Sequence, residues 1–300
     1  MAPPHGRQKL RNNEKHDSEW SPRNVRICPT RKRNSNVIIH FMRHAEPLHK
    51  VDSNNPDLTM LDPDLSPRGR EQCLSFARDF EPQSKYITHI ISCPMTRTLT
   101  TSLLALSSVI SRGVPVLALP ELQNLDPGPA GRGKDPAELE QIYCANGGKE
   151  DSEFRGKINL TFMTSGWNGK DEGKWQNEVV QWRVDYIKGF LRGLGAGSPD
   201  IRVEVMVISH GSFLKKLIED GLFDDGKMES HAEWVNVGLI VGGPDEARFA
   251  DVPVRSFGFD ESGNLRELDR KELDIARGLL ELSREQNASV WKGRLRPRTP

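Results

Sequence analysis

Two short apolar segments, far apart in the chain, each lead directly into a histidine. Residues 37–42 precede Arg43 and His44, and residues 203–208 are followed one residue later by His210. Apolar runs of this length are typical of strands that are buried on both faces. In open α/β sheets, ligands bind at the carboxyl ends of the strands. The two histidines are therefore expected to meet at the binding edge of a parallel sheet.

The rest of the sequence alternates between strand-like and helix-like patterns. Further strands are expected over residues 86–92, 114–119, 234–241 and 254–259. Helices are expected from Pro67 onward, over 99–110, near 136–145, over 178–194, directly after His210 and over 273–282. The buried side of the 178–194 helix is predicted to consist of Val179, Trp182, Tyr186, Phe190 and Leu194. This alternation predicts an α/β fold, a three-layer sandwich in which a mostly parallel central sheet carries helices on both faces.

Differences in polarity divide the chain into one domain and two tails. Residues 1–35 contain nine Lys and Arg against three Asp and Glu, without periodic apolar residues, which predicts a disordered basic arm. Residues 36–285 are expected to form a single domain, with an insertion rich in Gly, Pro and charge at about 120–175. Residues 286–300 are expected to be a flexible basic tail.

The composition is that of a globular protein without a polyanion-binding signature. Apolar residues make up 36% of the chain, charged residues 28%, and the net charge is zero. No apolar stretch approaches the roughly 20 residues that span a bilayer, and no signal peptide is evident. The four cysteines form no C-x-x-C pair, which favours free thiols over a zinc site. We expect a cytoplasmic protein, with the nucleus as the alternative, that binds neither nucleic acid nor membrane; no pattern predicts an oligomeric state.

Four short motifs at the ends of the expected strands resemble those of one enzyme family. In chain order they are Arg43-His44-Ala45, Ser92 to Thr101 with Arg97, Pro120-Glu121-Leu122, and Ser209-His210-Gly211. The set is similar to the R-H-G/A, S-P-x-x-R, L-x-E and S/T-H-G elements of the histidine phosphatase superfamily, which is phosphoglycerate mutase-like. The form is most similar to fungal phosphoglycerate mutase family proteins. The resemblance covers about residues 36–260.

The resemblance, together with elementary chemistry, implies a role for each of these residues. His44 would attack phosphorus and form a phosphohistidine. Arg43 and Arg97 would clamp the phosphoryl oxygens, and a protonated His210 would donate a further hydrogen bond to them. Glu121 would protonate the departing oxygen and then activate water. No metal and no cofactor is expected, because the arginines and the histidine already neutralise the phosphate.

These roles predict a phosphomonoesterase that hydrolyses a small phosphorylated metabolite. A phosphoglycerate-type phosphomutase is the alternative enzyme, and a non-catalytic phospho-ligand-binding protein is the alternative outside catalysis. At the position where the family often carries asparagine, this chain has His49 and Lys50, which shifts the expected pocket mouth toward positive charge. Lys50 is expected either at that mouth or in solvent. His40, inside the first strand, is expected to be structural, and Trp167 is expected either to edge the pocket or to anchor a loop.

Overall fold

The computed structural model describes the chain over residues 37–52, 54–143, 156–170, 175–176, 179–196, 202–219, 254–260, 263–268, 272–274 and 277. All of these lie in the larger of two compact units, Lys32–Pro300. The predicted arm at 1–35, the predicted tail at 286–300 and the predicted strand at 234–241 fall outside the described residues. The domain limits given above therefore stay predictions.

A mixed seven-stranded sheet forms the centre of this unit, with the strand order β4-β3-β2-β5-β1-β6-β7. Its strands are β1 (Val37–Arg43), β2 (His89–Ser92), β3 (Val116–Ala118), β4 (Ile158–Asn159), β5 (Val203–Ser209), β6 (Val254–Phe259) and β7 (Leu265–Glu267). The first five strands in this order pair in parallel, whereas β6 and β7 add an antiparallel edge. The predicted α/β fold is confirmed.

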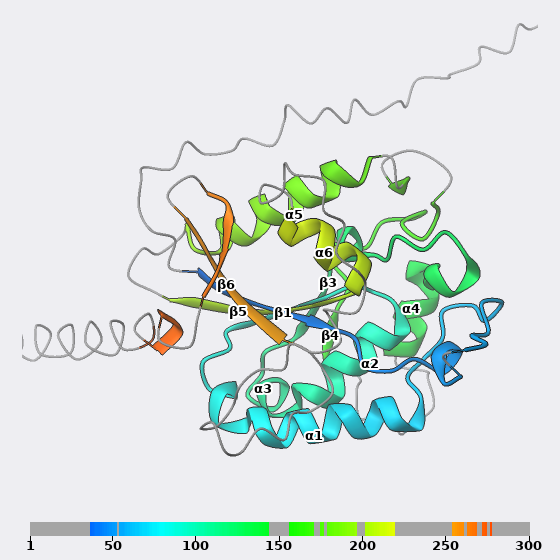
Figure 1. The fold of residues 1–300 in the computed structure, drawn as a ribbon, viewed down its shortest axis with the longest axis horizontal. Helices are drawn as coiled ribbons and strands as arrows, with labels where there is room; N and C mark the ends of the chain where they lie inside the picture. The colour runs from blue at the N-terminus through cyan, green and yellow to red at the C-terminus, as the bar shows by residue number, and fades with distance from the viewer. Residues whose placement is uncertain are drawn as a thin grey trace, which may run out of the picture. The chain divides into compact units, whose positions relative to one another are not determined.

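Helices cover both faces of the sheet. Figure 1 shows the first three helices on one side of the strands and α5 and α6 on the other. The α-helices are α1 (Pro67–Ser84), α2 (Thr96–Ala105), α3 (Ser107–Ser111), α4 (Pro136–Tyr143), α5 (Val180–Leu194) and α6 (Gly211–Glu219). Three short 3-10 helices are η2 (Leu48–Lys50), η3 (Pro120–Leu122) and η4 (Pro129–Gly131). The expected helix over 99–110 is thus two helices, α2 and α3.

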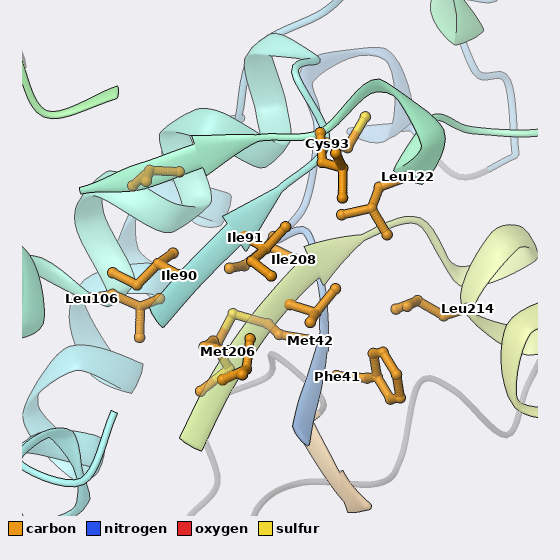
Figure 2. Close-up of a cluster of buried hydrophobic side chains, with 14 of the residues drawn as sticks. Phe41, Met42, Ile90, Ile91, Cys93, Leu106, Leu122, Met206, Ile208 and Leu214 are labelled. Carbon is orange, nitrogen blue, oxygen red and sulfur yellow. The ribbon is translucent and has the colours of Figure 1, made fainter. Parts of the chain in front are cut away.

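The core lies between the sheet and these helices. Every residue of β5 is buried, as are the first six of β1, which explains why both segments read as continuous apolar runs. Figure 2 shows side chains of β1, β2 and β5 packed with Leu106, Leu122 and Leu214. The burial of this cluster fixes the central strands, and hence the positions of the segments that follow them.

Helix α1 begins where the sequence predicts. The Ser66 hydroxyl accepts a hydrogen bond from the Gly69 N–H, and Pro67 occupies the first helical position. Gly69 also lets the helix approach the loop after β1, since a Cβ there would lie 2.1 Å from the Glu46 carbonyl oxygen. The apolar stripe expected for this helix consists of Cys73, Phe76, Ala77 and Phe80; all of these except the half-buried Ala77 are buried.

Helix α5 exists where expected, but its most buried side differs from the predicted one. The buried residues are Arg183, Val184, Ile187, Lys188 and Leu191. The predicted residues Val179, Trp182, Tyr186, Phe190 and Leu194 are half-buried or exposed, although the last three pack against the core. At about 100° per residue, the predicted row covers an arc of about 120° on one side of the helix, and the buried residues are centred about 100° further around. The aromatic rings pack against one another along the flank, with centroids of Tyr186 and Phe190 6.4 Å apart.

The insertion at about 120–175, which was expected to hold at most one or two short helices, contributes more regular structure than that. Helix α4 is present as expected. In addition, β4 pairs with β3 and extends the sheet by one strand. Two residues are too few to give a recognisable strand pattern, and the same holds for the three residues of β7.

Candidate active site

The parallel pairing of β1 with β5 brings the two motif histidines together. Arg43 is in register with Ser209, and the His44 N–H donates to the Ser209 carbonyl at 3.0 Å. The rings of His44 and His210 therefore lie edge to face, with centroids 5.1 Å apart. Both side chains are buried, 8% and 2% exposed. The strand ends thus form a two-histidine site, as their sequence positions predicted.

Arg97, from the first turn of α2, bridges the two rings. Its Nε–H donates to His44 Nε2 and its Nη2–H donates to His210 Nδ1, each at 3.3 Å. A guanidinium group can only donate hydrogen bonds, so both of these ring nitrogens must be unprotonated. The protons then lie on His44 Nδ1, 2.7 Å from the Ala45 carbonyl, and on His210 Nε2, 3.2 Å from Cys93 Sγ. The contacts of Arg97 define the tautomer of each ring.

Both imidazoles are neutral at neutral pH. Burial lowers the pKa of His44 well below its usual value, and Arg97 and Arg43 lower it further. Burial likewise lowers the pKa of His210 well below its usual value, with Arg97 and His44 adding to the effect. His210 is therefore neutral beside Arg97, because an imidazolium here would face arginine in a desolvated site. The expected protonation of His210 concerns the phosphate-bound site and stays a prediction.

Arg97 owes its position to a residue outside the recognised motifs. Helix α2 begins without a side-chain cap from its own N-cap residue, Met95. The Asp62 carboxylate takes this role, accepting from the Thr96 N–H at 3.0 Å and from the Thr96 hydroxyl at 2.6 Å. Lys134 Nζ donates to the same carboxylate at 3.0 Å. An acidic side chain suits the positive end of the helix, but a cap supplied from a distant loop leaves no local signal in the sequence.

A cavity of about 350 Å³ opens around the histidines, which is enough for a small metabolite. It is lined by Arg43, His44, His49, Lys50, Arg97, Asn124, Leu125, Asp126, His210, Gly211, Ser212 and Lys215. Four of these side chains are permanently cationic and one is a carboxylate. Neither Arg43 nor Arg97 forms an ion pair with any residue that the structure describes. The cavity is thus a cationic site that offers donors to an anion.

Glu121 is the one predicted site residue that does not line this cavity. It lies in η3, directly after β3, and is 6% exposed. Burial lowers the pKa of Arg183 to about 10, and the charge of Glu121 counteracts this as a smaller influence. Burial raises the pKa of Tyr186, and Glu121 raises it further. The carboxylate that lines the cavity is Asp126, five residues further along the chain.

The loop that carries Asp126 is held from several sides. Asn124 Oδ1 accepts from the Asp126 N–H at 3.1 Å and from the Ser212 hydroxyl at 3.0 Å. The buried Lys170 Nζ donates to the Asn124 carbonyl at 2.6 Å and to the Asp126 carbonyl. Burial, reinforced by Arg183, lowers the pKa of Lys170 to about 7. A Cβ at Gly131 would fall 2.0 Å from the Asp126 carbonyl oxygen, so this position requires glycine. None of these contacts was apparent from the sequence.

Trp167, Lys50 and His40 lie in different surroundings. Trp167 is fully buried, donates from Nε1 to the Lys134 carbonyl at 3.0 Å and does not line the cavity, so it anchors a loop. Lys50 lines the cavity while remaining exposed. His40 is structural, as expected: its Nε2 lies 2.9 Å from a Glu204 oxygen and its Nδ1 lies 2.8 Å from the Ser256 hydroxyl.

The described part of the chain lacks two kinds of feature. No three His, Cys, Asp or Glu side chains are grouped there in a way that could hold a metal ion. None of the helices described there is both long and apolar enough to cross a membrane.

Comparison with known families identifies the segment that carries most of this site. Residues 39–156 match the family model of the histidine phosphatase superfamily, branch 1. This segment, less than half of the chain, is similar to the members of that superfamily. It contains Arg43, His44 and Arg97, whereas His210 lies beyond it. No curated protein matches the sequence, and nothing supports the expected closeness to fungal phosphoglycerate mutase family proteins.

Solved structures similar to this chain include several phosphatases. One is the ecdysone phosphate phosphatase of Bombix mori in complex with tungstate, with 14% identity, coverage of 77% of this chain and 92% of that chain, and a TM-score of 0.46. Another is a phosphoserine phosphatase variant of Entamoeba histolytica with phosphoserine, with 14% identity, 78% and 95% coverage, and a TM-score of 0.40. A mycobacterial glucosyl-3-phosphoglycerate phosphatase has 15% identity, 77% and 96% coverage, and a TM-score of 0.40. All three TM-scores are below 0.5, and the architecture described above rests on the strand order itself.

Proposed function

We propose that this protein is a phosphomonoesterase that hydrolyses a small phosphorylated metabolite through a phosphohistidine at His44. One observation carries the proposal: a neutral, buried His44 presents an unprotonated Nε2 to a cavity whose arginines have no described ion-pair partner. An imidazole lone pair beside unmatched guanidinium groups suits attack on a phosphoryl group and little else.

In the first step, Arg97 would move its Nε–H from His44 Nε2 to a phosphoryl oxygen. The freed lone pair of Nε2 would form a bond to phosphorus while the bond from phosphorus to the ester oxygen breaks. The Ala45 carbonyl accepts from Nδ1–H and so holds the lone pair of Nε2 in the attacking direction. Arg43 and Arg97 would stabilise the negative charge on the phosphoryl oxygens, as preorganised donors do in phosphoryl transfer. His210 would turn its Nδ1 toward these oxygens and take up a proton as the dianion arrives.

The leaving oxygen needs a proton, and a carboxyl group would supply it. We assign this role to Asp126, because it lines the cavity and its backbone is fixed on both sides. Glu121, the residue suggested by the sequence, is the alternative donor. In the second step the resulting carboxylate would accept a proton from water as the water oxygen attacks phosphorus. The N–P bond then breaks, which releases phosphate and regenerates both groups.

Covalent trapping tests the proposal directly. The protein is mixed with an isotopically labelled phosphomonoester, quenched in alkali, and digested to locate the label. We expect acid-labile label on His44 in the wild type and none in His44→Asn. Absence of label together with absence of phosphate release would favour the non-catalytic binding protein. Conversion of 3-phosphoglycerate to 2-phosphoglycerate that requires a bisphosphate primer and releases no phosphate would favour the phosphomutase.

A further inference from the structure

Each of the two site histidines has one ring nitrogen near Arg97 and the other near an acceptor. For His44 the acceptor is the Ala45 carbonyl, 2.7 Å from Nδ1. For His210 the acceptor is the Cys93 sulfur, 3.2 Å from Nε2. The two rings use opposite nitrogens for the same arrangement. In each case the contact with the acceptor fixes the direction in which the other nitrogen presents its lone pair.

Cys93 is held firmly enough to act as such an acceptor. It directly follows β2, is fully buried and belongs to the core cluster of Figure 2. Its N–H donates to the Ile208 carbonyl at 3.0 Å, and the Thr98 hydroxyl donates to its carbonyl at 2.8 Å. Burial raises the pKa of its thiol to about 11, so the sulfur is neutral and unsuited to act as a nucleophile. Hydrogen bonding is what this side chain can contribute to the site.

Arg97 cannot serve both the histidines and a bound phosphoryl group. Among the described residues, the His210 ring forms hydrogen bonds with Arg97 at Nδ1 and with Cys93 at Nε2. When the guanidinium group turns to the phosphoryl oxygens, the first of these contacts is lost. The contact with Cys93 involves no group that binds the ligand, so it remains throughout the reaction.

We propose that Cys93 is a positioning residue for His210. Its sulfur accepts the Nε2–H and keeps Nδ1 directed at the phosphoryl oxygens while Arg97 binds them. The inference rests on the proposed function for the identity of the ligand, but the contact itself is tested without turnover.

The same contact favours the protonated ring in the complex. A charged donor forms a stronger hydrogen bond than a neutral one, so an acceptor at Nε2 stabilises the imidazolium more than the imidazole. Burial lowers the pKa of His210, and Arg97, His44, Lys170 and Arg43 lower it further. The sulfur opposes these influences, and a bound dianion opposes them more strongly.

The test follows the ring nitrogens of His210 by NMR as the pH is changed, in the full-length protein labelled with heavy-nitrogen histidine. Sulfate is the probe ligand, because it stays a dianion over the whole range and the titration then reports the protein alone. Comparison with His210→Gln identifies the signals. In the free wild type we expect the proton on Nε2 and an unprotonated Nδ1. With sulfate bound, the second proton should arrive at a higher pH than in the free protein.

Substitution of Cys93 separates its contribution from that of the ligand. In Cys93→Ala with sulfate, the titration midpoint of His210 should fall by about half to one pH unit, and the affinity for sulfate below the wild-type midpoint by about threefold to tenfold. Cys93→Ser keeps an acceptor and should stay close to wild type. Cys73→Ala is the matched control, because Cys73 is equally buried but lies in the apolar stripe of α1. It should lose stability without moving the signals of His210.

A wild-type ring protonated at Nδ1 would overturn the inference, and so would a Cys93→Ala titration that matches those of wild type and Cys73→Ala. The first of these outcomes is read on the wild type, so the inference stays testable if Cys93→Ala fails to fold. Phosphate release from simple esters is measured in parallel. A shifted titration without any turnover would remove the proposed function and leave Cys93 as the positioning residue of an anion site. Turnover with an unshifted titration would do the reverse.

Discussion

Two buried histidine clusters share strand β1, and they differ in what surrounds the imidazoles. His40 has a partner at both ring nitrogens, one of which is Glu204. Glu204 in turn is bound by Arg277 and lies 3.5 Å from Arg202. Four residues further along, His44 faces Arg97, and its described hydrogen-bond partners include no carboxylate.

The two clusters differ in charge balance: the first contains its own carboxylate, whereas the second is open to an anionic ligand. In the first, a carboxylate with a pKa lowered to about 2 balances the neighbouring cations. In the second, no described carboxylate forms an ion pair with Arg43 or Arg97, and burial, reinforced by these cations, keeps the histidines neutral. Burying unmatched cations costs stability, so their presence at a strand end indicates that an anion supplies the missing charge.

Substitution of the proposed nucleophile, His44, should have the largest effect on activity. His44→Ala should lower phosphate release by at least about a thousandfold, because the covalent step has no substitute. Its circular dichroism spectrum and melting temperature should match the wild type, since the side chain lies at the cavity wall. Activity within tenfold of wild type would remove His44 from the nucleophile role and the comparison would fail.

The arginines of the two clusters should respond in opposite ways. Arg97→Met should lower kcat by roughly a hundredfold to a thousandfold through lost charge stabilisation, with little loss of stability. Arg277→Met should leave Glu204 partly uncompensated and lower the free energy of unfolding by about 3 kcal/mol. Its activity should stay within a few-fold of wild type. Urea unfolding and phosphate release, measured on both variants, test this prediction. The same response from both variants would contradict the difference between the two clusters.

Substitution of the two candidate proton donors, Asp126 and Glu121, tests which of them contacts the substrate in the cationic site. Asp126→Asn should slow hydrolysis of an alkyl phosphate by about a hundredfold, and that of an aryl phosphate less, because an aryl leaving group hardly needs the proton. Glu121→Gln should have a smaller effect on both substrates. Burst kinetics separates the two chemical steps. A larger loss in Glu121→Gln than in Asp126→Asn would return the acid role to Glu121 and place it in contact with substrate.

Acid should destabilise the two clusters in different pH ranges. The pKa of Glu204 is about 2 when folded against a usual 4.5, so its contribution is complete above pH 4.5 and is lost as the pH falls through 2. The difference corresponds to about 3 kcal/mol. His44 and His210 have lowered pKa values, so the unfolded chain gains their protons first and stability already declines below pH 6.5. Glu204→Gln should abolish only the lower step. Urea unfolding at a series of pH values tests this, and loss of both steps would contradict it.

The smallest effect is expected from the basic arm. Deletion of residues 1–35 should change neither the melting temperature nor phosphate release, because the segment has no periodic apolar residues to bury. Both clusters should remain as they are in the full-length protein. A drop of several degrees on truncation would show that the arm docks on the domain and contributes to one of them.

Local patterns were sufficient for the parts of the fold that short segments determine. The apolar runs before His44 and His210 predicted β1 and β5, and Ser66 with Pro67 predicted the start of α1. Parallel strands end at one edge, so the meeting of the two histidines also followed.

Parts fixed by distant contacts could not be predicted in the same way. Asp126 lines the cavity because Lys170, 44 residues later, holds its backbone carbonyl and because Gly131 leaves room for that carbonyl. The cap on α2 comes from Asp62, 34 residues before the helix begins. The apolar row of α5 does lie on one side of the helix, but tertiary packing decides which side faces the core, and the most buried residues lie further around the helix from that row.

The register of the β1–β5 pair also sets the alignment of the two histidines at the edge of the sheet. A slip of two residues along either strand would keep every apolar side chain on its proper face, so the core alone opposes it only weakly. Such a slip would nevertheless offset His44 from His210 by about 7 Å. In one direction it would also carry His40 away from Glu204, whose contact spans the same two strands, whereas in the other direction it would place these two residues directly opposite each other. The contact between His40 and Glu204 inside the sheet thus opposes the first of these slips and helps to keep the two histidines together at the edge of the sheet.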